Sequence, residues 1–238
     1  MHPLLQGLAA GDRNGGPIRM ALLLYQSLES NRDFVYEDVL SSYRNWFRNG
    51  AYDTGATLVR TFLLMEDGYA PEEAVRLSYA YQPSDGVAPA HRASPIAIFL
   101  SGEELDRALY QEAKMTHFSE ISAQVSIMVG RICSLLLQNL SLEDAIQRSK
   151  RGLDRRVCPM VPAIDSCSAG GYAPDVLASA LAFLLHYDSF EESLCAALTF
   201  AGSANYCPVL VGAIGGCLYG GIPASLMQHD QTPAVFQT

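Results

Sequence analysis

The chain has 238 residues, of which 49% are apolar and 17% charged, and its formal net charge at pH 7 is -9. This length fits one domain with a large buried core, while the charged fraction lies below the globular average of about 25%. The acidic excess offers no basic surface to nucleic acid or an anionic membrane, and no apolar stretch reaches the ~18 residues of a membrane span. We therefore expect neither nucleic acid nor a membrane as a partner.

Apolar residues recur every three to four positions along most of the chain, which predicts a series of amphipathic helices. Residues 175–185 are apolar almost all round and predict a buried central helix. The glycine-rich residues 209–219 predict a helix packed very closely against its neighbours. No alternating pattern is long enough for a sheet. In chain order, the other clear helical stretches begin near Ile18, Phe118, Leu142 and Leu194.

Five short segments are typical of helix N-termini, because each combines a capping oxygen or a proline with nearby carboxylates. Capping is the role that we favour for them. The predicted fold is all-α, with one helical domain over residues 1–224 and an extended or frayed tail over residues 225–238. The five segments begin at Ser30, Ala70, Ser101, Ser141 and Ser189.

Six cysteines occur in the chain, none of them in a CxxC pair, and no signal peptide precedes the first predicted helix. Disulfide frameworks are typical of secreted proteins, whereas reduced cysteines in apolar stretches behave as small hydrophobic residues. The sequence therefore predicts a cytoplasmic protein with free thiols. The six are Cys133, Cys158, Cys167, Cys195, Cys207 and Cys217.

Four glycine-rich segments, residues 11–17, 85–92, 165–172 and 202–208, hold most of the unusual polar residues. Each has a proline inside it or just after it, and three lead directly into a strong helix. Free N–H groups at such helix starts attract phosphate or carboxylate. If the segments converge, they could hold a diphosphate; the alternative is ordinary helix capping.

The candidate ligand-binding residues come from these segments and from one Thr-His pair. Each has a competing structural role: a cap for His117, a surface ion pair for His91 and Arg92, and a buried thiol for Cys207. No GxSxG, HExxH, Walker loop or paired-cysteine metal site is present. The candidates are Asn14, Gly15, Gly16, His91, Arg92, His117, Asp165, Gly171, Tyr172, Ser203, Asn205, Tyr206 and Cys207.

In chain order, the same segments resemble motifs of the ADP-ribosylglycohydrolase family, from Leu5 to about Pro223. The resemblance implies a compact orthogonal bundle of helices and, as ligand, ADP-ribose, a related nucleotide sugar or an ADP-ribosylated substrate. Residues 7–12 resemble the family's GLAxGD, 53–57 its DxGxTT, 86–95 its GNGxxMRxxP, 116–117 its Thr-His pair, 171–175 its GYxxDxL and 201–215 its GGDADTxAAIxGALxG.

The family resemblance also implies two magnesium ions, but this chain departs from the pattern that holds them. The TDDT stretch is missing between Asp12 and Met20, and Ser203, Asn205 and Tyr206 replace the late acidic and threonine positions. Neutral side chains cannot offset the dehydration of Mg²⁺ as carboxylates do. We therefore expect no conventional dinuclear centre and name no metal ligands.

Three hypotheses for the function follow. The first is hydrolysis of a glycosidic bond with little or no metal, in which Asp12, Asp53 or Asp85 supplies the carboxylate that such cleavage needs; Asp165 is a further carboxylate candidate. The second is a catalytically inactive binding or structural protein, as in the crystallin branch of the family. The third is an enzyme with a different substrate that uses Cys207 as nucleophile. The oligomeric state stays open.

Overall fold

The computed structural model describes residues 1–158, 160–204 and 206–223. Within these ranges the chain forms α-helices and one short 3-10 helix, and its only β contact is an isolated bridge, so the all-α prediction is confirmed. The predicted tail over residues 225–238 and the candidate Asn205 lie outside the described residues. The helices are α1 (Pro3–Asp12), α2 (Gly16–Asn31), α3 (Tyr36–Arg48), α4 (Ala56–Glu66), α5 (Pro71–Tyr81), α6 (Ala88–Ala93), α7 (Ile96–Phe99), α8 (Gly102–Lys114), α9 (Glu120–Leu137), α10 (Leu142–Ser149), η1 (Ile164–Ser166), α11 (Ala173–His186), α12 (Phe190–Ala201) and α13 (Tyr206–Tyr219).

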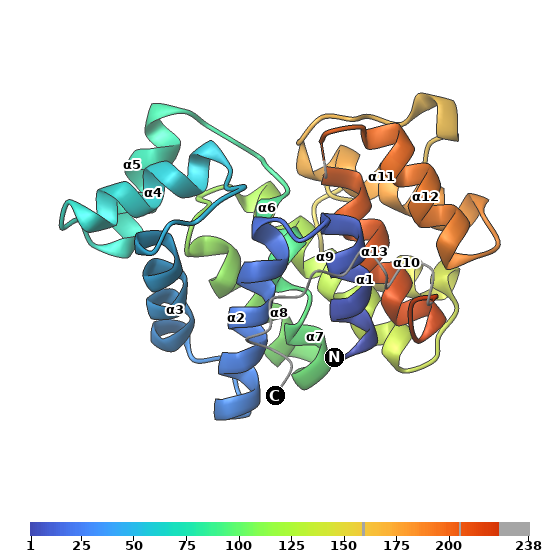
Figure 1. Ribbon diagram of the computed structural model, residues 1–238, viewed down its shortest axis with the longest axis horizontal. Helices are drawn as coiled ribbons and strands as arrows, with labels where there is room; N and C mark the ends of the chain where they lie inside the picture. Colours follow the sequence, from blue (N-terminus) through green and yellow to red (C-terminus); the bar gives the residue numbers. More distant parts are fainter. Residues whose placement is uncertain (159, 205, 224–238) are drawn as a thin grey trace.

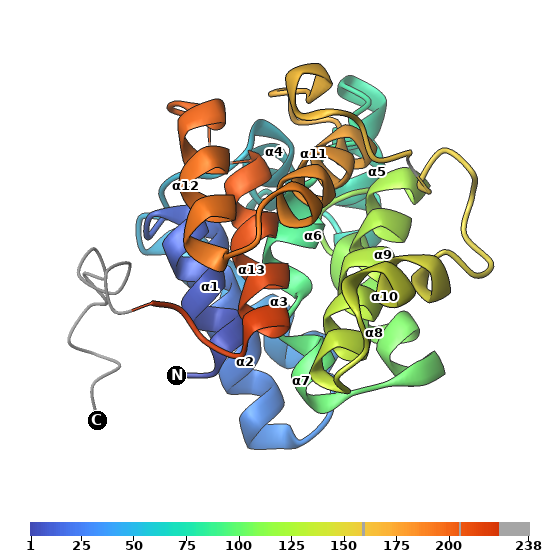
Figure 2. The ribbon, with the colours of Figure 1, turned by 90° about the vertical axis from the view of Figure 1, so that its right-hand side faces the viewer.

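The first and last of these helices, α1 and α13, lie side by side in both ribbon views (Figures 1 and 2). A Cβ atom on Gly7 or Gly212 would collide with the carbonyl oxygen of the other residue, and one on Gly216 would collide with the carbonyl oxygen of Pro3. Side chains are therefore absent where the two backbones meet. The close packing predicted for residues 209–219 is confirmed.

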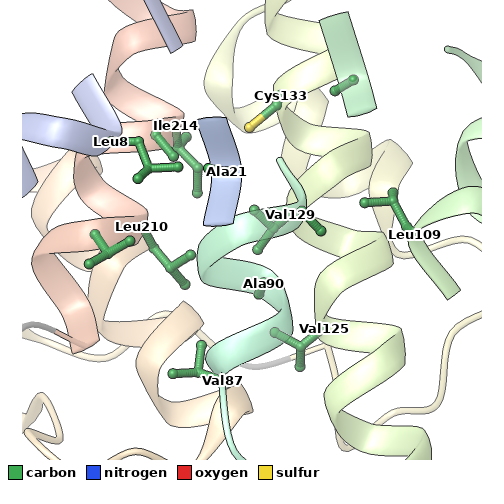
Figure 3. Packing of buried hydrophobic residues seen from close by; sticks show 14 of the residues in the cluster. Leu8, Ala21, Val87, Ala90, Leu109, Val125, Val129, Cys133, Leu210 and Ile214 are labelled. Atoms are coloured by element: carbon green, nitrogen blue, oxygen red, sulfur yellow. The ribbon is translucent and has the colours of Figure 1, made fainter. Parts of the chain in front are cut away.

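Short helix α6 occupies the middle of the core, where it contacts α2, α9 and α13. Its Ala90 faces Val129 of α9 on one side, and Leu210 of α13 lies on the other (Figure 3). All three side chains are buried. Since α6 belongs to the second glycine-rich segment, the core fixes that segment from beneath.

Helices α9 and α11 have apolar faces almost all round, and both are largely buried. The burial of α11 confirms the central helix predicted over residues 175–185. With 18 residues and a mean hydropathy of 1.4, α9 is long and apolar enough to cross a membrane, contrary to the expectation that no stretch reaches that length. However, 72% of α9 is buried inside the protein, which accounts for its apolar composition.

Four of the five predicted helix starts are confirmed, at α5, α8, α10 and α12. The start predicted at Ser30 is wrong, because α2 continues to Asn31 and ends where Arg32 adopts a left-handed conformation with φ of 59°. The helix start predicted at Thr116 and His117 is also wrong. Helix α9 begins at Glu120 after Ser119, whose hydroxyl accepts a hydrogen bond from the Ser122 N–H.

Candidate functional site

A cavity of about 600 Å³ lies where all four glycine-rich segments meet. This volume is within the range of small-molecule sites, roughly 300–1,000 Å³. The segments contribute residues 16–17, 85–88 with 91–92, 171–172 and 203–204 with 206, and residues 53–58 complete one wall. In Figure 1 the helices that bound it belong to the α3–α5 side and the α11–α13 side of the molecule, with α6 between them.

Backbone hydrogen bonds join the second and third segments beside the cavity. Gly86 and Tyr172 form the isolated antiparallel bridge, in which the Val87 N–H donates to the Gly171 carbonyl at 3.2 Å and the Ala173 N–H donates to the Asp85 carbonyl at 2.9 Å. Asp85 lies on the cavity wall, and its carboxylate accepts a 2.5 Å hydrogen bond from the Ser119 hydroxyl. The bridge therefore holds the backbone of Asp85, and the Ser119 hydroxyl holds its side chain.

His91 joins the second segment to the fourth. Its Nε2 lies 2.8 Å from the Tyr206 carbonyl oxygen, and the two rings stack with centroids 6.3 Å apart. A carbonyl oxygen only accepts, so Nε2 carries the proton and Nδ1 is left as an acceptor. Burial lowers the pKa of His91 to about 4, and the nearby Arg92 lowers it further while the Tyr206 hydrogen bond opposes the shift. His91 is therefore neutral at pH 7.

A buried polar network lies beneath the cavity. Arg92 Nε donates to Glu112 Oε1 at 2.6 Å, and the Tyr43 hydroxyl donates to the same oxygen at 3.0 Å. The Arg92 and Glu112 side chains are only 1% and 0% exposed, so the surface ion pair considered for His91 and Arg92 is wrong. Arg92 Nη2 donates to the Thr116 hydroxyl at 2.8 Å. Arg92 Nη1 is buried and has no hydrogen-bond partner within the described part of the chain.

His117 follows this network into the cavity wall. Its Nδ1 lies 2.9 Å from the Thr116 hydroxyl oxygen. Burial, with a smaller contribution from the Arg92 charge, lowers the pKa of His117 to about 3. The cavity therefore has two neutral histidines on its wall, each with one ring nitrogen held by a defined partner.

Two carboxylates hold the start of α2. Asp12 Oδ2 accepts from the Ile18 N–H at 2.8 Å, and Asp53 Oδ2 accepts from the Gly16 N–H at 3.2 Å. A Cβ atom on Gly15 would collide with Asp53 Oδ2 and lie 2.8 Å from Asp12 Oδ1, so only glycine fits between them. Asp53 therefore caps α2, whereas Gly55 is the N-cap residue of the helix that follows it, α4.

The chain matches the family model of ADP-ribosylglycohydrolase over residues 5–233. This chain belongs to the ADP-ribosylglycohydrolase family. A solved structure of an "ADP-ribosylglycohydrolase-related protein complex" superposes with a TM-score of 0.79 at 20% sequence identity, over 95% of this chain and 90% of the other. No curated protein sequence matches the chain. The predicted family and fold are thus confirmed, and membership supports a glycohydrolase-like function.

The donor set of this chain does not fit a dinuclear magnesium centre. Mg²⁺ needs several anionic oxygens in octahedral geometry, but the residues that the structure describes contain no group of three or more acidic, histidine or cysteine side chains suited to a metal. Asp12 and Asp53 are each engaged by a backbone N–H of α2, and Ser203 is on the cavity wall in the late motif. That no metal binds stays a prediction.

Most candidate residues of the sequence lie on the cavity wall, but several do not. Asp12 is buried behind the wall, and Asn14 and Gly15 are beside it, where the Asn14 carbonyl accepts from the Tyr52 hydroxyl. Asp165 lies exposed on η1, away from the cavity. The candidates on the wall are Gly16, Asp53, Asp85, His91, Arg92, His117, Gly171, Tyr172, Ser203 and Tyr206.

Cys207 is also off the cavity wall, although its neighbour Tyr206 is on it. The Cys207 side chain is 2% exposed, and burial raises the pKa of its thiol to about 12. A nucleophilic cysteine requires a lowered pKa and access to substrate. The structure therefore corrects the proposed ligand-binding or nucleophilic role of Cys207 to that of a buried thiol.

Sequence reasoning missed two residues that matter here. Trp46, the single tryptophan, reaches the wall from α3, where it resembles any apolar residue of an amphipathic helix. Glu112 looks like a surface carboxylate of α8, and only its contact with Arg92, 20 positions earlier, reveals its role. In both cases the informative signal is a long-range contact. The only hint in the sequence is the motif arginine itself, because a buried arginine needs a carboxylate partner.

Proposed function

We propose that this member of the ADP-ribosylglycohydrolase family binds an ADP-ribosyl group or a related nucleotide sugar in the cavity, without a dinuclear magnesium centre. The observation that carries the proposal is the meeting of all four glycine-rich segments around one cavity of about 600 Å³. A nucleotide sugar presents aromatic, sugar and diphosphate parts, and the wall offers matching aromatic, polar and backbone groups. Family membership supports the same ligand class.

The N-terminus of α4 is the part of the wall best suited to a diphosphate. Gly55, Ala56 and Thr57 all lie on the wall, and Gly55, the N-cap residue, makes no side-chain capping hydrogen bond. Uncapped N–H groups at a helix start attract anionic oxygens. Helix α2 differs, because Asp12 and Asp53 already engage its first N–H groups. We therefore assign the diphosphate to the start of α4.

Aromatic faces near the opening suit the flat part of the ligand. Tyr172 and Tyr206 lie on the wall and are 42% and 41% exposed. Gly171 packs directly beneath the Tyr206 ring, where a Cβ atom would lie 3.3 Å from the ring carbon Cζ. The exposed part of an aromatic ring that its neighbours hold in place can stack against a base.

Asp85 is the carboxylate to which we assign hydrolysis. Cleavage of a glycosidic bond proceeds through an oxocarbenium-like transition state and needs a carboxylate that stabilises charge or takes a proton from water. Asp85 lies on the wall, and the Ser119 hydroxyl fixes one of its oxygens at 2.5 Å. Asp53 also lies on the wall, but one of its oxygens is engaged by α2.

Binding without turnover is the second candidate function. The observation that favours it is that two of the three candidate catalytic carboxylates, Asp12 and Asp53, cap a helix. A cap needs its charge and position for stability, which leaves a single carboxylate for chemistry. The two functions share the ligand and differ only in product formation.

Calorimetric titration with ADP-ribose, in Mg²⁺ and again in EDTA, tests the binding. We expect binding of equal affinity in both buffers, and turnover of an ADP-ribosylated arginine or serine peptide that Asp85→Asn abolishes while retaining affinity. Asp165→Asn is the matched control, because Asp165 is exposed and off the cavity. Binding without product would select the second candidate, and a lack of binding in both buffers would exclude both.

A further inference from the structure

We propose that Glu112, Arg92 and Thr116 fix the tautomer of His117, so that its Nε2–H is held as a hydrogen-bond donor to an oxygen of the ligand. The ligand rests on the proposed function, whereas the tautomer does not. The sequence places His117 among the candidate ligand-binding residues, with helix capping as the alternative, and the proposed function assigns it no role. The inference follows from the order of donors and acceptors in one buried chain of hydrogen bonds.

The chain of hydrogen bonds begins at Glu112. Its carboxylate accepts from Arg92 Nε at 2.6 Å and from the Tyr43 hydroxyl at 3.0 Å, with Arg92 Nη2 at 3.5 Å from the second oxygen. All three side chains are fully buried. The guanidinium plane is therefore fixed, and with it the direction in which Nη2 points.

The Thr116 hydroxyl connects Arg92 to His117. A guanidinium has only donors, so at the 2.8 Å contact with Arg92 Nη2 the Thr116 hydroxyl must accept. The hydroxyl has one proton of its own to donate. Among the described residues, its only other hydrogen-bond neighbour is His117 Nδ1, at 2.9 Å. Donation to Nδ1 is the arrangement that gives this proton an acceptor, and it leaves Nδ1 unprotonated.

His117 then carries its single proton on Nε2. The ring is neutral, because burial and the Arg92 charge keep its pKa near 3. Nε2 lies beside the second glycine-rich segment, since a Cβ atom on Gly86 would be 3.7 Å from it. No residue in the described ranges forms a hydrogen bond with Nε2, and the side chain is on the cavity wall. This N–H is thus a spare donor at the site.

The neutral N–H of His117 determines which ligand atoms can bind there. It suits a sugar hydroxyl, a glycosidic oxygen or a phosphate oxygen, and it gives no advantage to a cationic group. His91 differs, because its Nε2–H is already used by the Tyr206 carbonyl. The two histidines thus present opposite groups, a donor at His117 and an acceptor at His91.

Nitrogen NMR of protein labelled with ¹⁵N-histidine reads the tautomer directly in the absence of ligand. We expect His117 Nδ1 to be unprotonated and Nε2 protonated at pH 7. Thr116→Val keeps the shape of the side chain but removes the hydroxyl, and should give a mixture of tautomers, while Thr116→Ser should restore the single form. His186→Gln, which removes an exposed histidine off the cavity, serves as the matched control. A proton on His117 Nδ1 in the unaltered protein would overturn the inference.

Titration of the same sample with ADP-ribose tests the donor role. We expect the Nε2–H resonance to shift, and His117→Phe to raise Kd by about 3- to 10-fold, the range for one neutral hydrogen bond. Unchanged affinity in His117→Phe would overturn the donor role. If ADP-ribose does not bind even to the unaltered protein, the proposed function fails, and the ligand-free spectra still decide the tautomer.

Discussion

Gly7 in α1 and Gly212 in α13 meet backbone to backbone, each positioned where a methyl group on the other would overlap its carbonyl oxygen. The two helices come from opposite ends of the described chain, so this contact joins its first helix to its last (Figure 2). It also fixes the fourth glycine-rich segment, because α13 begins at Tyr206, on the cavity wall.

Gly212→Ala should destabilise the protein by at least about 2–3 kcal/mol, since overpacking that pushes against backbone cannot be relieved by a rotamer change. Gly221→Ala is the control, because nothing lies within 4 Å of a Cβ atom there and its φ is not left-handed. Urea unfolding followed by circular dichroism measures both. Equal stability of Gly212→Ala and Gly221→Ala would contradict the close contact.

Helix starts were predictable from sequence because their signals are local. Ser141 and Ser189 accept hydrogen bonds from N–H groups three residues later, so a short window contains the whole interaction. The prediction at Ser30 was wrong for a related reason. Serine and asparagine occur at both ends of helices, and here they precede Arg32, whose left-handed conformation ends α2.

The cavity was predictable in part. Glycine and proline at helix starts marked the four segments, but their meeting depends on contacts such as that between His91 and the Tyr206 carbonyl, 115 positions apart. Trp46 and Glu112 escaped notice because their roles depend on distant partners. The sequence predicts a catalytic carboxylate at Asp12 or Asp53, yet only the structure shows that both hold the start of α2.

Glu112→Gln should cost about 3–5 kcal/mol of the free energy of unfolding, because it leaves the Arg92 charge buried without a partner. The matched control is Glu66→Gln, which removes a more exposed carboxylate paired with Arg44 and Arg48, and should cost less than about 1 kcal/mol. Denaturant unfolding compares them. The double variant Arg92→Met with Glu112→Met should regain much of the loss, and failure of Glu112→Gln to exceed its control would refute the buried pair.

The free energy of unfolding should decrease as the pH falls below about 6.5. Unfolded histidines bind protons near that value, whereas folding holds the pKa of His91 near 4 and that of His117 near 3. Protons therefore favour the unfolded chain from about pH 6.5 down to the folded pKa values, by up to about 1.4 kcal/mol per pH unit for each histidine. Above about pH 7.5 neither histidine contributes a slope.

Unfolding free energies at pH 7.5 and pH 5 measure this dependence. His117→Gln should reduce the decrease by the share of one histidine, because glutamine does not titrate. His186→Gln should leave the decrease unchanged, since His186 is exposed. The same pH dependence in His117→Gln as in the unaltered chain would show that His117 is not buried in its neutral form.

Cys207 should react with iodoacetamide more than about tenfold more slowly than Cys195 near neutral pH. Burial raises the pKa of the Cys207 thiol to about 12, so almost no thiolate forms, and the side chain is hidden from reagent. Cys195 is exposed and serves as the internal reference. Mass spectrometry of the native protein after timed labelling gives both rates. Fast labelling of Cys207 would contradict the buried thiol and support the hypothesis that it is a nucleophile.

Asp12→Ala should lower the stability by about 1–3 kcal/mol, and by the same amount in Mg²⁺ as in EDTA. The reason is that Asp12 accepts from the Ile18 N–H inside the protein, and its removal leaves that donor buried without this acceptor. Asp165→Ala, on the exposed η1, should change stability by less than about 0.5 kcal/mol. Thermal unfolding at rising Mg²⁺ concentration decides between a cap and a metal ligand. A cation-dependent increase in the Tm of the unaltered chain that Asp12→Ala abolishes would mean that Asp12 binds the ion, because only binding to the folded state raises Tm by mass action.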